Sequence, residues 1–186
     1  MIEICIHGRG GQGAVVASQI LSYALFLEGK FSQSFPTFGA ERRGAPVAAY
    51  VRISNTFINN RYEVTNPNYV IVLSGKLTEK IDVSSGIKDN GLILINSEKD
   101  SSYFSFIKEK CRVLAFDVNS ISLRYKLGSA YMPMVNVPIL GVFARITDLL
   151  QLDSLIKALP RFITVSLKKN EDALIESYNQ ASLICA

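Results

Sequence analysis

The segment Gly8-Arg9-Gly10-Gly11-Gln12-Gly13 constrains the fold of this chain more than any other feature. It follows residues 2–7, whose β-branched, alternating pattern predicts a strand, and opens residues 12–28, whose apolar residues recur at helical spacing until Gly29. Glycines at such a junction allow a tight turn, and N–H groups at a helix start favour a phosphate, to which Arg9 can add its charge. The segment predicts either a phosphate site or a tight turn without a ligand.

The rest of the chain predicts strands alternating with helices. Strands are expected at residues 31–35, 47–53, 69–73, 91–95 and 113–118, with an antiparallel continuation at 57–61. Helices are expected at residues 75–83, 102–110, 137–150, 152–159 and 170–183, with Asn136, Asp153 and Asn170 as N-caps for the last three. This order predicts a three-layer α/β/α Rossmann-like sandwich, with a largely parallel sheet and an antiparallel extension, in a single domain over residues 1–186.

Composition excludes several classes of protein. Hydrophobic residues make up 48% and charged residues 19%, so the chain is globular, and no apolar run reaches the length of a membrane helix. The basic residues are dispersed and the aromatic residues are not interleaved with them, which argues against nucleic-acid binding. Cys5, Cys111 and Cys185 are far apart, so we expect reduced thiols, no metal held by this chain and, without an export signal, a cytoplasmic protein.

A second glycine-bracketed loop carries charge. Gly39, Glu41, Arg42, Arg43 and Gly44 lie between two predicted strands, where the arginines can bind phosphates and the glutamate can pair with one of them. Solvated loop charge is the alternative. The one histidine, His7, ends the first predicted strand without a nucleophile motif around it, so packing or ligand contact is favoured over general-base catalysis.

The glycine motif alone would suggest a nicotinamide dinucleotide. Such a site needs an acidic residue at the end of the second strand to bind the ribose, and residues 33–38 contain none. Glu28 precedes that strand and belongs to the end of the helix. A different phosphate-bearing ligand is therefore favoured.

Residues 6–21, IHGRGGQGAVVASQIL, and 35–54, FPTFGAERRGAPVAAYVRIS, together resemble the gamma subunit of pyruvate and related 2-oxoacid:ferredoxin oxidoreductases. NPNYVIVL at residues 66–73 and VNVPILGVFARIT at 135–147 extend the resemblance to about residue 150. It implies a noncatalytic subunit that assembles with alpha, beta and delta subunits. The complex would oxidatively decarboxylate a 2-oxoacid, with pyruvate favoured, to acyl-coenzyme A and carbon dioxide, and pass the electrons to ferredoxin.

The resemblance also implies where the cofactors lie. Thiamine diphosphate and [4Fe-4S] clusters would belong to the partner subunits, and this chain would hold coenzyme A. Its phosphates would meet Gly8, Arg9, Gly10, Gly11, Gln12 and Gly13, and the loop with Gly39, Glu41, Arg42, Arg43 and Gly44 would grip them. Two alternatives stay open: a free-standing Rossmann-like dinucleotide-binding oxidoreductase, and a purely structural subunit whose charged loop docks a neighbour.

Overall fold

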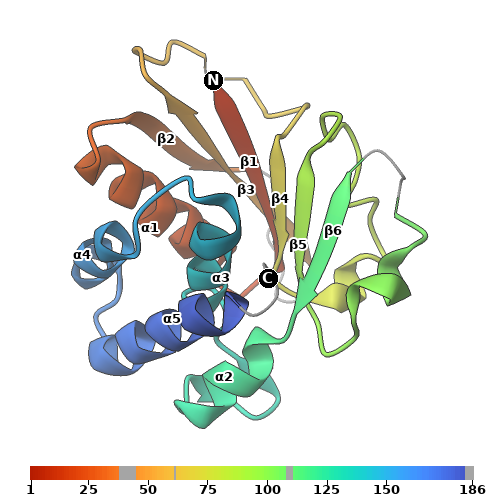
Figure 1. Ribbon diagram of the computed structural model, residues 1–186, viewed down its shortest axis with the longest axis vertical. Helices are drawn as coiled ribbons and strands as arrows, with labels where there is room; N and C mark the ends of the chain where they lie inside the picture. Colours follow the sequence, from red (N-terminus) through yellow and green to blue (C-terminus); the bar gives the residue numbers. More distant parts are fainter. Residues whose placement is uncertain (38–44, 61, 108–110, 183–186) are drawn as a thin grey trace.

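The computed structural model describes residues 1–37, 45–60, 62–107 and 111–182. Within them, a central sheet of six strands has the order β2-β3-β1-β4-β5-β6 (Figure 1). Its strands are β1 (Ile2–Arg9), β2 (Phe31–Pro36), β3 (Pro46–Ser54), β4 (Tyr69–Val72), β5 (Leu92–Asn96) and β6 (Arg112–Phe116). β1, β4, β5 and β6 run parallel, while β3 pairs antiparallel with both β1 and β2. The predicted largely parallel sheet with an antiparallel extension is confirmed.

The antiparallel extension of the sheet is shorter than predicted. Residues 57–60 belong to no strand, because the chain turns away from the sheet after β3 at Ser54 and Asn55. The Ser54 hydroxyl accepts a hydrogen bond from the Thr56 N–H, a local bond that competes with strand pairing. Residue 61, the last of the predicted continuation, lies outside the described residues.

Helix α1 (Ala14–Leu27) packs on the sheet through small and aliphatic residues, among them Ala17, Ile20 and Ala24, all fully buried. It ends where the sequence predicts, because Gly29 adopts a φ of +78° and Lys30 donates to the carbonyl of Leu25. The predicted first strand, glycine turn and helix are therefore all present.

The remaining long helices lie on the same face of the sheet as α1 (Figure 1). They are α3 (Pro138–Thr147), α4 (Leu152–Phe162) and α5 (Leu167–Ala181). The three expected N-caps were wrong: Val137, Gln151 and Ser166 occupy the N-cap positions, and none of these three makes a side-chain capping hydrogen bond. Asn170 lies inside α5, where its side-chain amide donates to the carbonyl of Ser166.

The opposite face is covered by loops and 3-10 helices in place of the two helices predicted there. η1 (Gly75–Leu77) follows β4 and η2 (Ser101–Phe104) follows β5. Asp82 and Asp100 accept hydrogen bonds from nearby serine N–H and hydroxyl groups, and such local bonds favour turns over continuous helix. Residues 108–110 of the second predicted helix lie outside the described residues. A second core of Cys5, Val70, Val72, Ile93 and Ile95 packs beneath this layer.

Two elements were not predicted: helix α2 (Val118–Arg124) and the hairpin of β7 (Gly128–Ser129) and β8 (Met132–Pro133). Asp117 caps α2 by accepting from the N–H groups of Asn119 and Ser120. The predicted strand at 113–118 therefore ran through a helix start, although aspartate is one of the residues preferred at an N-cap.

Candidate functional site

A cavity of about 690 Å³ lies at the carboxyl edge of the sheet. Arg9, Gly10 and Gln12 line it from the end of β1, Ser74 and Lys76 from the end of β4, and other residues from the end of β5. The chain leaves β1 for the β2 side of the sheet and later adds β4 on the other side, so the strand order reverses here. In open α/β sheets, ligands bind at such a switch point, and this volume is typical of a small-molecule site.

The glycine-rich turn is held closed by its own hydrogen bonds. The Arg9 N–H donates to the side-chain oxygen of Gln12 over 2.8 Å, and the Gln12 N–H donates back to the Arg9 carbonyl over 2.9 Å. Helix α1 begins at Ala14, and its first i to i−4 bond runs from Ala17 to the Gly13 carbonyl. The turn therefore has a defined shape without any ligand.

The glycines of the motif have different roles. A Cβ at Gly8 would lie 3.1 Å from both Ala14 and Leu73, and one at Gly13 would lie 2.7 Å from the side-chain nitrogen of Asn136. Gly11 has a φ of +96° with open space around it. Of the six predicted residues, Arg9, Gly10 and Gln12 line the cavity, whereas Gly8 and Gly13 permit close packing beneath it.

The second predicted loop cannot be placed, because residues 38–44, with Gly39, Glu41, Arg42, Arg43 and Gly44, lie outside the described residues. Its flanks are described. Thr37 bonds to the carbonyl of Ala48 through its N–H and its hydroxyl, and the Ala45 carbonyl accepts from the Gly10 N–H over 2.9 Å. Both flanks thus lie at the carboxyl edge, and one of them touches the glycine-rich turn directly.

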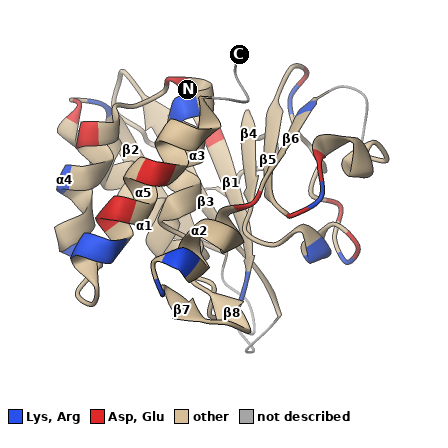
Figure 2. Cartoon of the chain, turned by 60° about the horizontal axis from the view of Figure 1, so that its bottom comes forward, with Lys and Arg blue, Asp and Glu red and all other residues tan. Residues whose placement is uncertain are grey.

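Sequence reasoning missed several residues of the cavity. Lys76 and Lys99 follow β4 and β5, and with Arg9 they place three cations around it, against the acids Glu79 and Glu98. Their position after parallel strands was a usable signal, because those ends meet at one edge of the sheet. The α2 and hairpin side carries no charge in its lining, which comprises Asn119, Leu123, Ala130, Tyr131, Met132 and Pro133. Figure 2 shows β7 and β8 without charged residues.

His7 has a packing role in this structure. Its Nε2 lies 3.3 Å from the Sγ of Cys5 on the face opposite the helices, and it does not line the cavity. Burial lowers the pKa of His7 to about 4 and raises that of Cys5 to about 12, so both side chains are neutral at pH 7. Neither is poised as a base or a nucleophile.

The strand order disfavours a nicotinamide dinucleotide. In that class of site the second strand neighbours the first and ends in an acid that binds the ribose. Here β3 separates β2 from β1, and β2 contains no acidic residue. The strand order therefore leads to the same conclusion as the missing acidic residue, that a nicotinamide dinucleotide is disfavoured.

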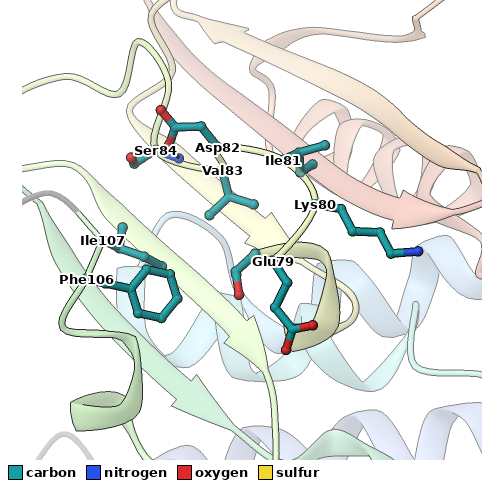
Figure 3. A pocket seen from close by; sticks show the side chains of 9 residues that line it. Glu79, Lys80, Ile81, Asp82, Val83, Ser84, Phe106 and Ile107 are labelled. Atoms are coloured by element: carbon teal, nitrogen blue, oxygen red, sulfur yellow. Dashed lines mark hydrogen bonds between the residues drawn. The ribbon is translucent and has the colours of Figure 1, made fainter.

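A second, shallower cavity of about 440 Å³ lies on the face opposite the helices. Figure 3 shows its lining, with Ile81 to Ser84 on the loop after η1 and Phe106 and Ile107 on a neighbouring segment. Ser84 is tied to the Asp82 carboxylate by its N–H and its hydroxyl. This cavity lies away from the glycine-rich turn and shares only Glu79 with the first cavity.

The described residues contain neither a metal-binding cluster nor a helix that could span a membrane. No group of three or more His, Cys, Asp or Glu side chains in that part of the chain could hold a metal ion. None of the helices described combines the length and the apolar character needed to cross a membrane. Fold and cavity together define a Rossmann-like α/β domain with a cavity at the switch point of its sheet.

Comparison with known proteins narrows this class. Residues 3–180 match the family model described as pyruvate ferredoxin/flavodoxin oxidoreductase. The chain is 48% identical over 157 residues to pyruvate synthase subunit PorC of Methanothermobacter marburgensis, covering 84% of each protein. It is 41% identical over 186 residues to the pyruvate/ketoisovalerate oxidoreductases common subunit gamma of Pyrococcus furiosus, covering 98% of each.

Solved structures of similar proteins support the same family relationship. The crystal structure of pyruvate oxidoreductase subunit PORC from Thermotoga maritima superposes with a TM-score of 0.75 at 31% identity, covering 96% of this chain and 95% of that one. A 2-oxoglutarate:ferredoxin oxidoreductase from Magnetococcus marinus shares the fold, with a TM-score of 0.75 at 18% identity over 98% of this chain and 31% of that one. This chain therefore belongs to the pyruvate ferredoxin/flavodoxin oxidoreductase family, as a gamma-type subunit of a multi-subunit oxidoreductase.

Proposed function

We propose that this chain is the coenzyme A-binding module of a 2-oxoacid:ferredoxin oxidoreductase whose substrate is pyruvate. The complex converts the 2-oxoacid and coenzyme A to acyl-coenzyme A and carbon dioxide and reduces ferredoxin. Thiamine diphosphate and [4Fe-4S] clusters are carried by the alpha, beta and delta subunits, and this chain contributes no catalytic residue. Cofactors supply the redox chemistry in such enzymes, while protein groups bind and orient the reactants.

The observation that carries the proposal is that the glycine-rich turn and cations from the ends of β1, β4 and β5 line the same cavity. Arg9, Lys76 and Lys99 line one cavity, and coenzyme A carries a pyrophosphate and a 3′-phosphate that need such partners. The bond from Gly10 to Ala45 brings the end of the second loop to the same place. Gly39, Glu41, Arg42, Arg43 and Gly44 are proposed to complete the phosphate site. The Magnetococcus marinus relative is itself described with coenzyme A bound.

A steady-state experiment on the reconstituted complex tests the binding role. The double variant Lys76→Ala/Lys99→Ala should raise the KM for coenzyme A about tenfold or more, because two charge-assisted contacts are lost, and leave the KM for pyruvate unchanged. The matched control is Lys157→Ala/Lys168→Ala, which removes the same charge from α4 and α5. An unchanged KM for coenzyme A in the first variant rejects the assignment.

The second loop separates ligand binding from subunit docking. Arg42→Ala/Arg43→Ala should leave assembly of the complex intact and raise the KM for coenzyme A. Size-exclusion chromatography measures the first effect, and initial rates at varied coenzyme A measure the second. Loss of assembly with an unchanged KM would instead assign this loop to docking.

A further inference from the structure

Asn96 joins three segments around the cavity. It is the last residue of β5, its exposed fraction is 2%, and it lines the cavity. Its Nδ2 donates to the Leu73 carbonyl and to Oδ1 of Asn119, each over 3.0 Å, and its Oδ1 accepts from the Val118 N–H over 3.1 Å. One buried amide thus links the end of β4, the end of β5 and the first residues of α2.

The bond to Leu73 leads to the glycine-rich turn. The Leu73 N–H donates to the carbonyl of His7, and its side chain lies 3.1 Å from where a Cβ of Gly8 would be. The last ladder pair between β4 and β5 is Val72 with Ile95, so Asn96 continues the connection of these two strands one residue beyond their ladder. It therefore fixes the wall of the cavity that carries the turn.

The bonds to Val118 and Asn119 lead to the opposite wall. Helix α2 carries Leu123, and the hydroxyl of Ser122 donates to the Met134 carbonyl, which ties the helix to the chain just after the β7–β8 hairpin. That hairpin holds Tyr131 and Met132 at the rim. A shift of the α2 N-terminus would move this whole uncharged wall.

We infer that Asn96 is a positioning residue that sets the separation between the two walls of the coenzyme A cavity: the glycine-rich turn on one side, α2 and the hairpin on the other. This inference rests on the proposed function of the cavity. Asn96 acts through the backbone groups of Leu73 and Val118 and the side chain of Asn119, and it performs no chemistry. Buried amides whose partners are all in place are costly to disturb, because each lost partner leaves a desolvated polar group.

The test uses the assembled complex with two uncharged variants, Asn96→Ala and the milder Asn96→Ser, which retains a polar hydroxyl at this position. Both avoid a carboxylate, which would repel the phosphates directly. The Ala variant should raise the KM for coenzyme A about tenfold and the Ser variant less, with kcat and the KM for pyruvate near those of the unaltered complex. If the Ala variant fails to assemble, the KM for coenzyme A of the Ser variant provides the test.

Asn68→Ala is the matched control, because its Oδ1 accepts from the Glu3 N–H and from Lys88, joining segments at the opposite, amino-terminal edge of the sheet. It should lower thermal stability without changing the KM for coenzyme A. The inference is overturned if both Asn96 variants leave that KM unchanged, or if kcat and the KM values for coenzyme A and pyruvate all change together. An effect of Lys76→Ala/Lys99→Ala without one of Asn96 rejects only this inference, whereas no effect of the lysines rejects the proposed function.

Discussion

The guanidinium Nε of Arg52 donates a 3.0 Å hydrogen bond to Oε1 of Glu3, its cross-strand partner in the pairing of β3 with β1. Arg52 is 1% exposed, and its other nitrogens donate to the carbonyls of Asn60 and Tyr62. Its guanidinium also lies 5.0 Å from the centre of the Phe35 ring. One buried cation therefore holds the segment after β3 against the sheet.

Replacing Arg52 with Met should reduce the free energy of unfolding by about 3–5 kcal/mol, because Glu3 loses its buried partner and two carbonyls lose their donor. Urea unfolding measures this loss. Glu3→Gln, which keeps an acceptor for Arg52, should cost less. Equal or greater stability of Arg52→Met would show that packing of the aliphatic stem suffices at this position.

Gly13→Ala should destabilise the chain by about 2–3 kcal/mol, since its φ is +79° and the new Cβ would lie 2.7 Å from the side-chain nitrogen of Asn136. Gly29→Ala is the control: its φ is +78°, but no atom lies within 4 Å of the added Cβ, so only the backbone cost of about 1 kcal/mol remains. Denaturant unfolding of both variants gives the difference. Equal losses would mean that Asn136 moves aside freely.

Replacing a glycine inside a helix with alanine usually stabilises the helix by about 1 kcal/mol. Gly141→Ala should instead destabilise the chain. The added Cβ would lie 2.4 Å from the Leu174 carbonyl and from the Ser177 hydroxyl, where α3 crosses α5. We expect a net loss of about 3 kcal/mol in unfolding experiments. Adding Ser177→Ala should recover little, because that hydroxyl also donates to the Pro138 carbonyl.

The lowered pKa of His7 predicts how the free energy of unfolding depends on pH. Its folded pKa of about 4 lies below the ordinary value of 6.5, so between these values the unfolded chain binds a proton that the folded chain does not. Stability is full above pH 6.5 and falls as the pH drops towards 4, by about 2 kcal/mol at pH 5 from this group. His7→Gln should remove that part of the loss in urea unfolding at pH 7.5 and 5.

NMR gives an independent check, because His7 is the one histidine in the sequence and its ring signals are unambiguous. In the folded chain they should not titrate between pH 7.5 and 5. A midpoint near 6.5 would contradict the burial of the ring and its pairing with Cys5.

Local patterns in the sequence were enough for the parallel strands, helix α1 and the position of the glycine-rich turn. Period-2 and helical spacing report burial directly, and Gly29 ends α1 through its own backbone preference. The 3-10 helices after β4 and β5 were beyond such reasoning, because short Asp and Ser hydrogen bonds compete there with helix formation. The hairpin of β7 and β8 has two residues in each strand, too few to show a period.

The sequence by itself determined the family resemblance, the sheet strands and the turn at Gly8 to Gly13, because these depend on residues close together in the chain. The tertiary structure alone decided which glycines line the cavity and which permit packing, because Asn136 reaches Gly13 from far along the sequence. It also brought Lys76 and Lys99 to Arg9 and placed Asn96 between the walls. Parallel strands gather their carboxyl ends at one edge, so groups from distant loops meet only once the sheet has formed.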